Sequence, residues 1–308
     1  MIVAADDMTD LPRIRRAEPM HRHTSWRVGG PADYFVKPTS RDDLIAALAA
    51  LPRGLPVHWL GLGSNVLVRD GGIRGSVVAT GSLPKQIEQL DDFRVRVSAS
   101  VPCMLLARQC LAWKLGPAVF FAGIPGSIGG ALAMNAGAFG GETWNHVESV
   151  VTLDRYGVER VRPRSDYEIG YRTVVGPSPA EWFVGATFRF ERDADTPTTA
   201  IRALIAKRGE TQPMGAASCG SVFRNPPGDH AGRLVEEAGM KGERIGGAVV
   251  SDKHANFILN TGGATAADIE ALIERVRNEV EVQFGVRLEL EVRILGEREA
   301  PPVQGRWA

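Results

Sequence analysis

Two glycine-rich segments carry the strongest chemical signal in this sequence. The first is Gly-Leu-Gly-Ser-Asn at residues 61–65, and the second is Gly-Ile-Pro-Gly-Ser-Ile-Gly-Gly at residues 123–130. Glycine lets the backbone bend sharply and approach a ligand, and the main-chain N–H groups of such turns can bind an anion together with a Ser or Asn side chain. The two segments together therefore predict that the chain binds the pyrophosphate of a nucleotide cofactor.

The spacing within these segments excludes two common nucleotide-binding motifs. A P-loop has Lys and then Ser or Thr directly after its closing glycine, whereas Gly130 is followed by Ala131 and Leu132. A Rossmann motif has a third glycine shortly after the second, whereas Gly63 is followed by Ser-Asn and the apolar run at 66–68. An ordinary NTPase and a Rossmann dehydrogenase are therefore not expected. Two tight loops without a ligand are the alternative interpretation.

Two further segments contain residues that could do acid–base chemistry. In the segment at 219–226, Ser221 is followed by Arg224 and Asn225, so it could place a proton donor beside an anion-binding cation, or it could be an ordinary turn. Near the C-terminus, Glu289 and Glu291 alternate with apolar residues, which is also typical of the solvated face of a strand. The residue types alone do not decide between these interpretations.

The composition favours a small-molecule ligand. The 308-residue chain has 36 Lys and Arg against 36 Asp and Glu, so no net charge attracts nucleic acid or an anionic membrane. It shows no signal peptide and no stretch apolar enough to cross a membrane, and we expect a cytoplasmic protein without an obligatory protein partner. The pair His21 and His23 lacks further spaced ligands, so no metal site is expected. The odd number of cysteines predicts free thiols at Cys103, Cys110 and Cys219.

Periodicity places both glycine segments in one strand-rich region. Hydroxyl and acidic residues at 39–43 precede leucines at helical spacing and predict a short helix, and the apolar run at 57–62 predicts a strand that leads into the first segment. A strand at 93–99 and a helix at 102–115 precede the second segment. Further strands are predicted at 150–153, 158–161 and 183–190. We therefore expect a region over residues 21–192, with two subdomains that divide near residue 80.

A second, smaller α+β region is predicted after a polar linker at residues 193–199. Thr265 and Asp268 form the acidic variant of a capping box, and apolar residues at helical spacing then predict a helix that ends at Gly285. Strands are predicted at 247–250, 257–259 and 287–294. This domain is expected over residues 200–296, with a loosely ordered arm at 1–20 and a tail at 297–308.

Taken in order, these segments resemble one known family. The glycine segments combine with Gly-Tyr-Arg at 170–172 and with further segments at 24–30, 219–226, 231–239, 254–258 and 290–293. This series resembles the UDP-N-acetylenolpyruvoylglucosamine reductase family over residues 21–296, in its compact second type. The resemblance implies an α+β fold, in which an FAD-binding region of the p-cresol methylhydroxylase/vanillyl-alcohol oxidase type is followed by a smaller α+β substrate-binding domain.

The resemblance also implies the residues of the site. The catalytic residues would be Arg172, Ser221 and Glu291, and the substrate would contact Arg224 and Asn225. FAD would be bound mainly by the two glycine segments and the small residues after them. The implied FAD-binding residues are Gly61, Gly63, Ser64, Asn65, Gly123, Ile124, Pro125, Gly126, Ser127, Gly129, Gly130, Ala131, Asn135, Gly137 and Arg172.

In such a family, NADPH reduces FAD, and the flavin N5 then transfers a hydride to C3 of the enolpyruvyl group of UDP-N-acetylglucosamine enolpyruvate. The product is UDP-N-acetylmuramate, a precursor of peptidoglycan. The guanidinium of Arg172 would bind the substrate carboxylate as charge develops there, and Ser221 would donate a proton to C2. Glu291, rather than Glu289, would act at the substrate carboxylate.

Two positions depart from the family pattern. Arg224 stands where the family commonly has Lys, which keeps the charge but changes its geometry. Thr-Val-Val at 173–175 replaces a stretch that usually contains Ser, so the local contacts to flavin or substrate are in question. A flavin-dependent alcohol oxidase of the same superfamily and a non-catalytic flavin-binding module are the alternative functions.

Overall fold

The computed structural model describes residues 14–298, and the chain forms two compact units. Within the described range, unit 1 consists of residues 14, 36–62 and 78–212. Unit 2 consists of residues 15–35, 63–77 and 213–298. Each unit is thus built from stretches that lie far apart in the sequence.

This division differs from the predicted one, which kept residues 21–192 in one region. Strand β4 (Val66–Val68) pairs in parallel with β20 (Arg293–Leu295), so the chain after the first glycine segment belongs with the C-terminal residues. The predicted linker at 193–199 also lies inside unit 1, because α4 (Ala200–Thr211) follows it within that unit. Local sequence patterns carry no signal for such long-range pairing. They can therefore predict only domains that consist of one continuous stretch of chain.

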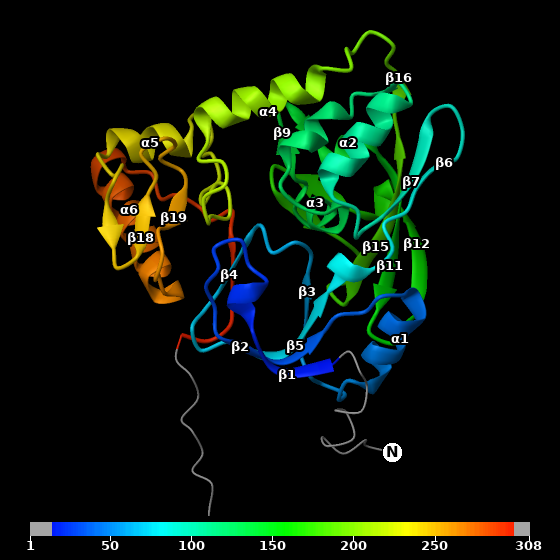
Figure 1. The fold of residues 1–308 in the computed structure, drawn as a ribbon, viewed down its shortest axis with the longest axis horizontal. Coiled ribbons are helices and arrows are strands. Elements are labelled where there is room, and N and C mark those ends of the chain that lie inside the picture. The colour runs from blue at the N-terminus through cyan, green and yellow to red at the C-terminus, as the bar shows by residue number, and fades with distance from the viewer. Residues whose placement is uncertain (1–13, 299–308) are drawn as a thin grey trace, which may run out of the picture. The chain divides into compact units, whose positions relative to one another are not determined.

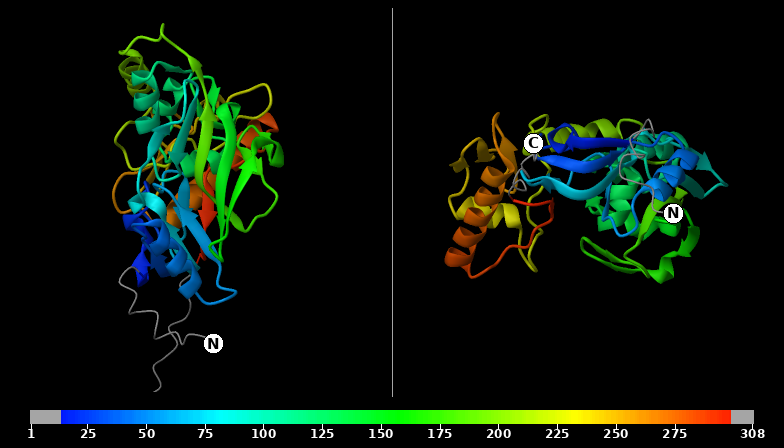
Figure 2. Two further views of the ribbon diagram at one scale, coloured as in Figure 1. Left: turned by 90° about the vertical axis from the view of Figure 1, so that its right-hand side faces the viewer. Right: turned by 90° about the horizontal axis from the view of Figure 1, so that it is seen from below.

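Unit 1 is organised around an antiparallel sheet with the strand order β12-β11-β15-β7-β6 (Figures 1 and 2). Its strands are β6 (Ile87–Gln89), β7 (Arg94–Ser98), β11 (Val147–Asp154), β12 (Glu159–Pro163) and β15 (Glu181–Arg189). The central pair runs from Val147 opposite Phe188 to Asp154 opposite Glu181, with two register shifts. The predicted strands at 93–99, 150–153, 158–161 and 183–190 are therefore confirmed.

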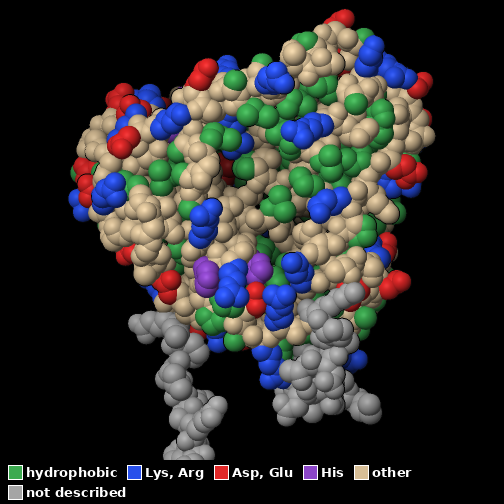
Figure 3. All heavy atoms as spheres, viewed as in Figure 1, with side chains coloured by type: hydrophobic (Ala, Val, Ile, Leu, Met, Phe, Trp, Pro, Cys, Tyr) green, Lys and Arg blue, Asp and Glu red, His purple; other side chains and the backbone are tan. Residues whose placement is uncertain are grey.

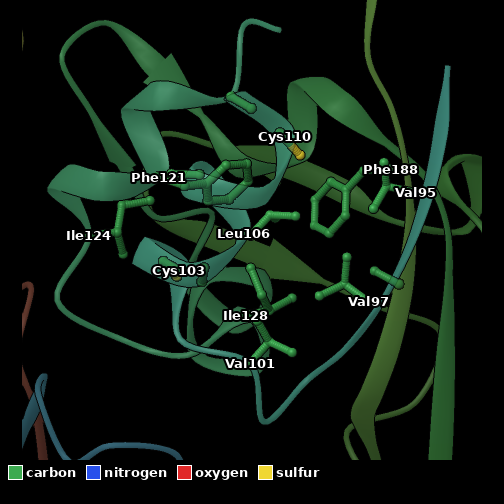
Figure 4. Packing of buried hydrophobic residues seen from close by; sticks show 14 of the residues in the cluster. Val95, Val97, Val101, Cys103, Leu106, Cys110, Phe121, Ile124, Ile128 and Phe188 are labelled. Carbon is green, nitrogen blue, oxygen red and sulfur yellow. The ribbon is translucent and has the colours of Figure 1, made fainter. Parts of the chain in front are cut away.

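Helices of unit 1 pack on this sheet and bury its core. Figure 4 shows side chains of β7, α2 (Cys103–Ala112), η4 (Val119–Gly123) and α3 (Ile128–Met134) that point toward one another. Phe121 meets Phe188 edge to face, with 5.6 Å between ring centroids. The other elements of unit 1 are α1 (Arg41–Ala50), β3 (Val57–Leu60), η3 (Thr80–Ser82), β8 (Leu115–Gly116), β9 (Gly137–Ala138), β10 (Gly141–Glu142), η5 (Thr143–His146), η6 (Arg164–Asp166), β13 (Glu168–Gly170), β14 (Thr173–Val175) and β16 (Glu191–Arg192).

Unit 2 has its own core beneath a long helix, α6 (Ala266–Phe284). The predicted capping box is present, because the Thr265 and Asp268 side chains each bond the other's main chain, and the helix ends at Gly285 with a positive φ. The apolar face of α6 packs against β18 (Ala248–Val250) and β19 (Ile258–Asn260) (Figure 1). The other elements that lie wholly or mostly in unit 2 are β1 (Ile14–Pro19), η2 (Met20–Arg22), β2 (Pro31–Val36), β5 (Ile73–Ala79), α5 (Ala231–Glu237) and β17 (Arg244–Ile245).

Two local predictions need correction. Residues 14–20, expected as part of a loose arm, form β1 and the start of η2, because Ile14 and Met20 are buried. The strand expected at 287–294 is limited to β20, which pairs with β4. The residues before it bond the segment at 222–224 through a single bridge instead: the Glu289 carbonyl accepts from Arg224 N–H, and Glu291 N–H donates to the Val222 carbonyl. The remainder of the predicted arm and tail lies outside the described residues, apart from Glu297, whose N–H donates to the Gly72 carbonyl, and Arg298, which pairs with Glu270.

The described surface and helices agree with the balanced composition. On the face shown in Figure 3, basic and acidic side chains are both spread over the surface. Among residues 14–298, each helix is too short or too polar to cross a membrane.

Candidate functional site

The two glycine segments touch within unit 1, through Gly61 and Ser127. A Cβ added at Gly61 would lie 2.6 Å from Ser127 Oγ, so a larger residue would push the two segments apart. Ser127 is also the N-cap of α3, where its hydroxyl accepts from the Gly130 N–H. The glycine at position 61 is therefore explained by close packing between the segments.

Most N–H groups of the second segment bond within the protein. The N–H groups of Ile128 and Gly129 each donate to a main-chain carbonyl oxygen at 2.8 Å, and that of Ala131 donates to the Ser127 carbonyl at 2.9 Å. Only the Gly130 N–H makes a long bond, at 3.5 Å to Ser127 Oγ. Of these four donors, the N–H of the exposed Gly130 is thus the one that could exchange its internal hydrogen bond for a bond to phosphate.

A cavity of about 150 Å³ lies beside the second segment, in unit 1. Ala99 connects the two, because it lines the cavity and its carbonyl accepts a hydrogen bond from the Gly129 N–H. The indole N–H of Trp59 is buried in its wall and has no hydrogen-bond partner among the described residues, and the Trp59 ring stacks on Trp182 at 5.1 Å. Residues lining the cavity include Trp59, Thr80, Ser98, Ala99, Phe183 and Val184. The cavity therefore offers aromatic walls and a donor to a planar, polar ring.

The Arg172 side chain is held against the residues that follow α3. Its guanidinium donates to the carbonyl oxygens of Asn135 at 2.8 Å and Gly137 at 3.2 Å, and it lies 4.9 Å from the Tyr171 ring centroid. Arg172 has a φ of 107°, which is rare for a residue other than glycine. A strained backbone and an oriented cation at one residue are typical of a functional site.

The first glycine segment continues into unit 2, where Asn65 contacts the C-terminal chain. Its side-chain amide donates to the Glu291 carbonyl at 3.0 Å, and its own carbonyl accepts from Arg293 N–H at 3.1 Å. Gly63 has a φ of 67°, and a Cβ there would lie 2.0 Å from the His23 carbonyl oxygen. Only glycine therefore fits at position 63.

Main-chain bonds bring the segments of Ser221 and Glu291 together in unit 2. The Glu291 N–H donates at 2.8 Å to the carbonyl of Val222, the residue after Ser221. Sequence reasoning did not single out Asn256, whose side chain bonds both the N–H and the carbonyl of Phe223, at 2.9 and 2.8 Å. The only sequence signal was a polar residue between apolar neighbours in the segment at 254–258.

Arg224 and Asn225 both have partners within unit 2. Arg224 forms an ion pair with Glu289 at 3.5 Å, and the Glu289 side chain is 75 % exposed. The Asn225 side-chain oxygen accepts from the Ala231 N–H at the start of α5. Because the Glu289 carboxylate is largely exposed, its ion pair with Arg224 contributes little to stability.

Cys219 is unsuited to the role of proton donor. The side chain is buried, and its sulfur lies 3.4 Å from the Val66 carbonyl oxygen. Burial raises the pKa of this thiol to about 12. This supports the choice of Ser221 over Cys219.

Family models match two parts of the chain. Residues 32–160 match the FAD-binding domain, and residues 212–295 match the C-terminal domain of UDP-N-acetylenolpyruvoylglucosamine reductase. The expected fold class is therefore confirmed, and so is FAD as the cofactor.

Whole-chain comparisons agree. The UDP-N-acetylenolpyruvoylglucosamine reductase of Alkalilimnicola ehrlichii is 53% identical over 97% of this chain and 100% of its own length, and that of Methylococcus capsulatus is 54% identical over 92% and 93%. A crystal structure of this reductase from Thermus caldophilus has a TM-score of 0.77 and 31% identity, and the match covers 92% of this chain and 99% of that one. The chain belongs to the UDP-N-acetylenolpyruvoylglucosamine reductase family.

Proposed function

We propose that this protein uses NADPH to reduce UDP-N-acetylglucosamine enolpyruvate to UDP-N-acetylmuramate, in the cytoplasmic synthesis of peptidoglycan precursors. The observation that carries the proposal is the main-chain bond between Glu291 and Val222, because it joins the segments of the acid and the hydroxyl that the reaction needs. The relatives that are more than half identical over nearly the whole chain support the same activity.

The residues present fit FAD. Gly61 leaves the two glycine segments in contact, and the exposed Gly130 carries an N–H with only a long internal bond. Beside them, the cavity at Trp59 has aromatic walls, and the indole N–H of this residue, which has no partner among residues 14–298, could donate to a ring nitrogen of adenine. We therefore assign the pyrophosphate to the glycine segments and the adenine to this cavity.

When bound, the flavin supplies hydride transfer from NADPH to C3 of the substrate. Arg172 then stabilises the charge that develops on the substrate carboxylate, because a guanidinium binds a carboxylate through two parallel hydrogen bonds. Ser221 donates the proton that C2 needs, and Glu291 acts beside it at the carboxylate. Arg224 and Asn225 bind the sugar or the diphosphate.

The test compares Ser221→Ala with Ser218→Ala, a matched control three residues away. The wild type should contain FAD and oxidise NADPH only when UDP-N-acetylglucosamine enolpyruvate is present. Ser221→Ala should be reduced normally by NADPH but lose turnover by about 100-fold or more, whereas Ser218→Ala should keep both. NADPH oxidation that does not depend on the substrate, or rapid reoxidation by oxygen with peroxide release, would show a different reaction.

A further inference from the structure

We propose that Asn135 is a positioning residue that holds the Arg172 guanidinium in place, rather than a ligand of FAD. The sequence expectation treated Asn135 as an FAD-binding residue, and that expectation stays untested. The inference rests on the proposed function, because it concerns the cation that acts on the substrate carboxylate.

Every polar group of Asn135 is engaged inside unit 1. Its N–H donates to the Ala131 carbonyl as the C-cap of α3, and its carbonyl accepts from Arg172 Nη1 at 2.8 Å. Its side-chain amide donates to Glu142 Oε2 at 3.0 Å and to the Gly170 carbonyl at 3.1 Å, and its side-chain oxygen accepts from Trp144 N–H at 3.1 Å. The residue is buried, with 1% of its surface exposed. A cofactor would have to displace these bonds in order to use Asn135.

The backbone conformation explains why the residue is asparagine. Asn135 has φ 46° and ψ 52°, in the left-handed region that glycine adopts freely and asparagine tolerates. Glycine would end the helix equally well, so the side chain is needed for its own hydrogen bonds. Those bonds tie the end of α3 to the segment at 142–144, through Glu142 and Trp144, and to Gly170.

The same bonds control the position of Arg172. Gly170 accepts from the Asn135 side chain and also from the Arg172 N–H at 2.6 Å, so Asn135 restrains the chain on which Arg172 sits. At the other end of the side chain, the carbonyls of Asn135 and Gly137 fix both Nη atoms. A Cβ at Gly137 would lie 3.2 Å from Arg172 Nη1 and equally close to Glu142 Cγ, so Glu142 packs against the same point. Asn135 therefore acts at both ends of Arg172: its side chain restrains the backbone at Gly170, and its carbonyl shares the guanidinium with that of Gly137.

The decisive variant is Asn135→Gly, which keeps the left-handed backbone and removes only the side-chain bonds. FAD affinity and flavin reduction by NADPH should stay within about 3-fold of wild type, whereas reoxidation of the reduced flavin by the enolpyruvyl substrate should slow by about 10- to 100-fold, as expected for a misplaced catalytic group. Asn260→Ala serves as the matched control, because it removes a side chain with three bonds, to Trp26, Gly262 and Ala264, that have no link to Arg172. It should lower stability without changing reoxidation.

A double-mutant cycle separates positioning from general structural damage. If Asn135 acts through Arg172, the variant with both Asn135→Gly and Arg172→Ala should reoxidise no more slowly than Arg172→Ala alone. If the double variant instead shows the product of the two single losses in reoxidation rate, the inference is overturned. A large loss of FAD affinity with normal reoxidation in Asn135→Gly would also overturn it. If Asn135→Gly does not fold, Glu142→Ala removes one of the same bonds and should slow reoxidation in the same direction. If Arg172→Ala reoxidises normally, the proposed role of Arg172 fails and the inference fails with it.

Discussion

Replacing Gly130 by alanine should stabilise the protein and weaken its binding of FAD. Gly130 lies inside α3, and a Cβ there would have Ser127 Oγ, at 3.8 Å, as its nearest neighbour, which is an ordinary contact. Alanine in a helix interior is more stable than glycine by about 0.5–1 kcal/mol. The same methyl group would occupy the exposed surface from which a pyrophosphate reaches the Gly130 N–H.

The size of the binding loss follows from that one contact. A hydrogen bond to a charged group contributes about 1.5–3 kcal/mol, so losing it should raise the dissociation constant of FAD by about 10- to 100-fold. We would measure the free energy of unfolding of the flavin-free protein by urea denaturation, and FAD affinity by fluorescence titration. Gly61→Ala offers a contrast: its Cβ would clash with Ser127 Oγ at 2.6 Å and should reduce both quantities.

Gly209→Ala is the matched control, because Gly209 lies inside α4 and an added Cβ meets no atom within 4 Å. It should give a similar gain in stability with unchanged FAD affinity. If Gly130→Ala binds FAD as tightly as wild type, the pyrophosphate does not approach this face of α3. If it is less stable than wild type, the space beside Gly130 is smaller than the structure indicates.

Three further outcomes test the packing of the fold. Burial lowers the pKa of His146 below its ordinary 6.5 and keeps the ring neutral in the folded protein, whereas the unfolded chain takes up the proton. The free energy of unfolding, measured by urea denaturation, should therefore fall as the pH is lowered from about 7.5 to about 5.5. This fall should be less steep in His146→Gln and as steep as in wild type in His21→Gln, whose histidine is exposed. Arg69→Gln should cost about 2 kcal/mol of the free energy of unfolding, because the Arg69 guanidinium is only 29% exposed and donates two hydrogen bonds to the buried Glu270. Arg298→Gln should cost less than about 1 kcal/mol, because that side chain is 72% exposed and donates one; equal losses would contradict this. The three cysteines are buried and burial raises the pKa of each, so a thiol reagent should label them only after unfolding, and fast labelling of the native protein would show an opening that the structure lacks.

Much of the local structure could be predicted from sequence because its causes lie within a few residues. The helix after Thr265 follows from a capping box, an apolar stripe and a closing glycine, and all three are present in α6. The strands of the large sheet in unit 1 follow from alternation. By contrast, α3 was expected only as part of a turn, since its run of small residues has no helical periodicity and its N-cap, Ser127, was assigned to the cofactor.

The sequence could predict which residues form the candidate site, but not which contacts hold them in place. Resemblance selected Ser221 and Glu291, while the bond that joins their segments depends on the fold of unit 2. The sequence also suggested that the N–H groups of the second glycine segment bind pyrophosphate. The fold uses those of Ile128 and Gly129 for internal bonds, because buried main-chain donors must be satisfied.

The sequence by itself determined the family, the cofactor and the residue types that the chemistry requires, because glycine-rich turns, caps and periodic faces are local properties. Tertiary structure decided which of those residues are exposed to a ligand and which are used internally. Asn135 shows the difference: its place after the second glycine segment predicted a contact with FAD, which stays a prediction, whereas its burial and its bonds to Glu142, Gly170 and Arg172 support the proposed positioning role. Hydrogen bonds between distant segments form only when the whole chain has folded, so no local pattern could have predicted them.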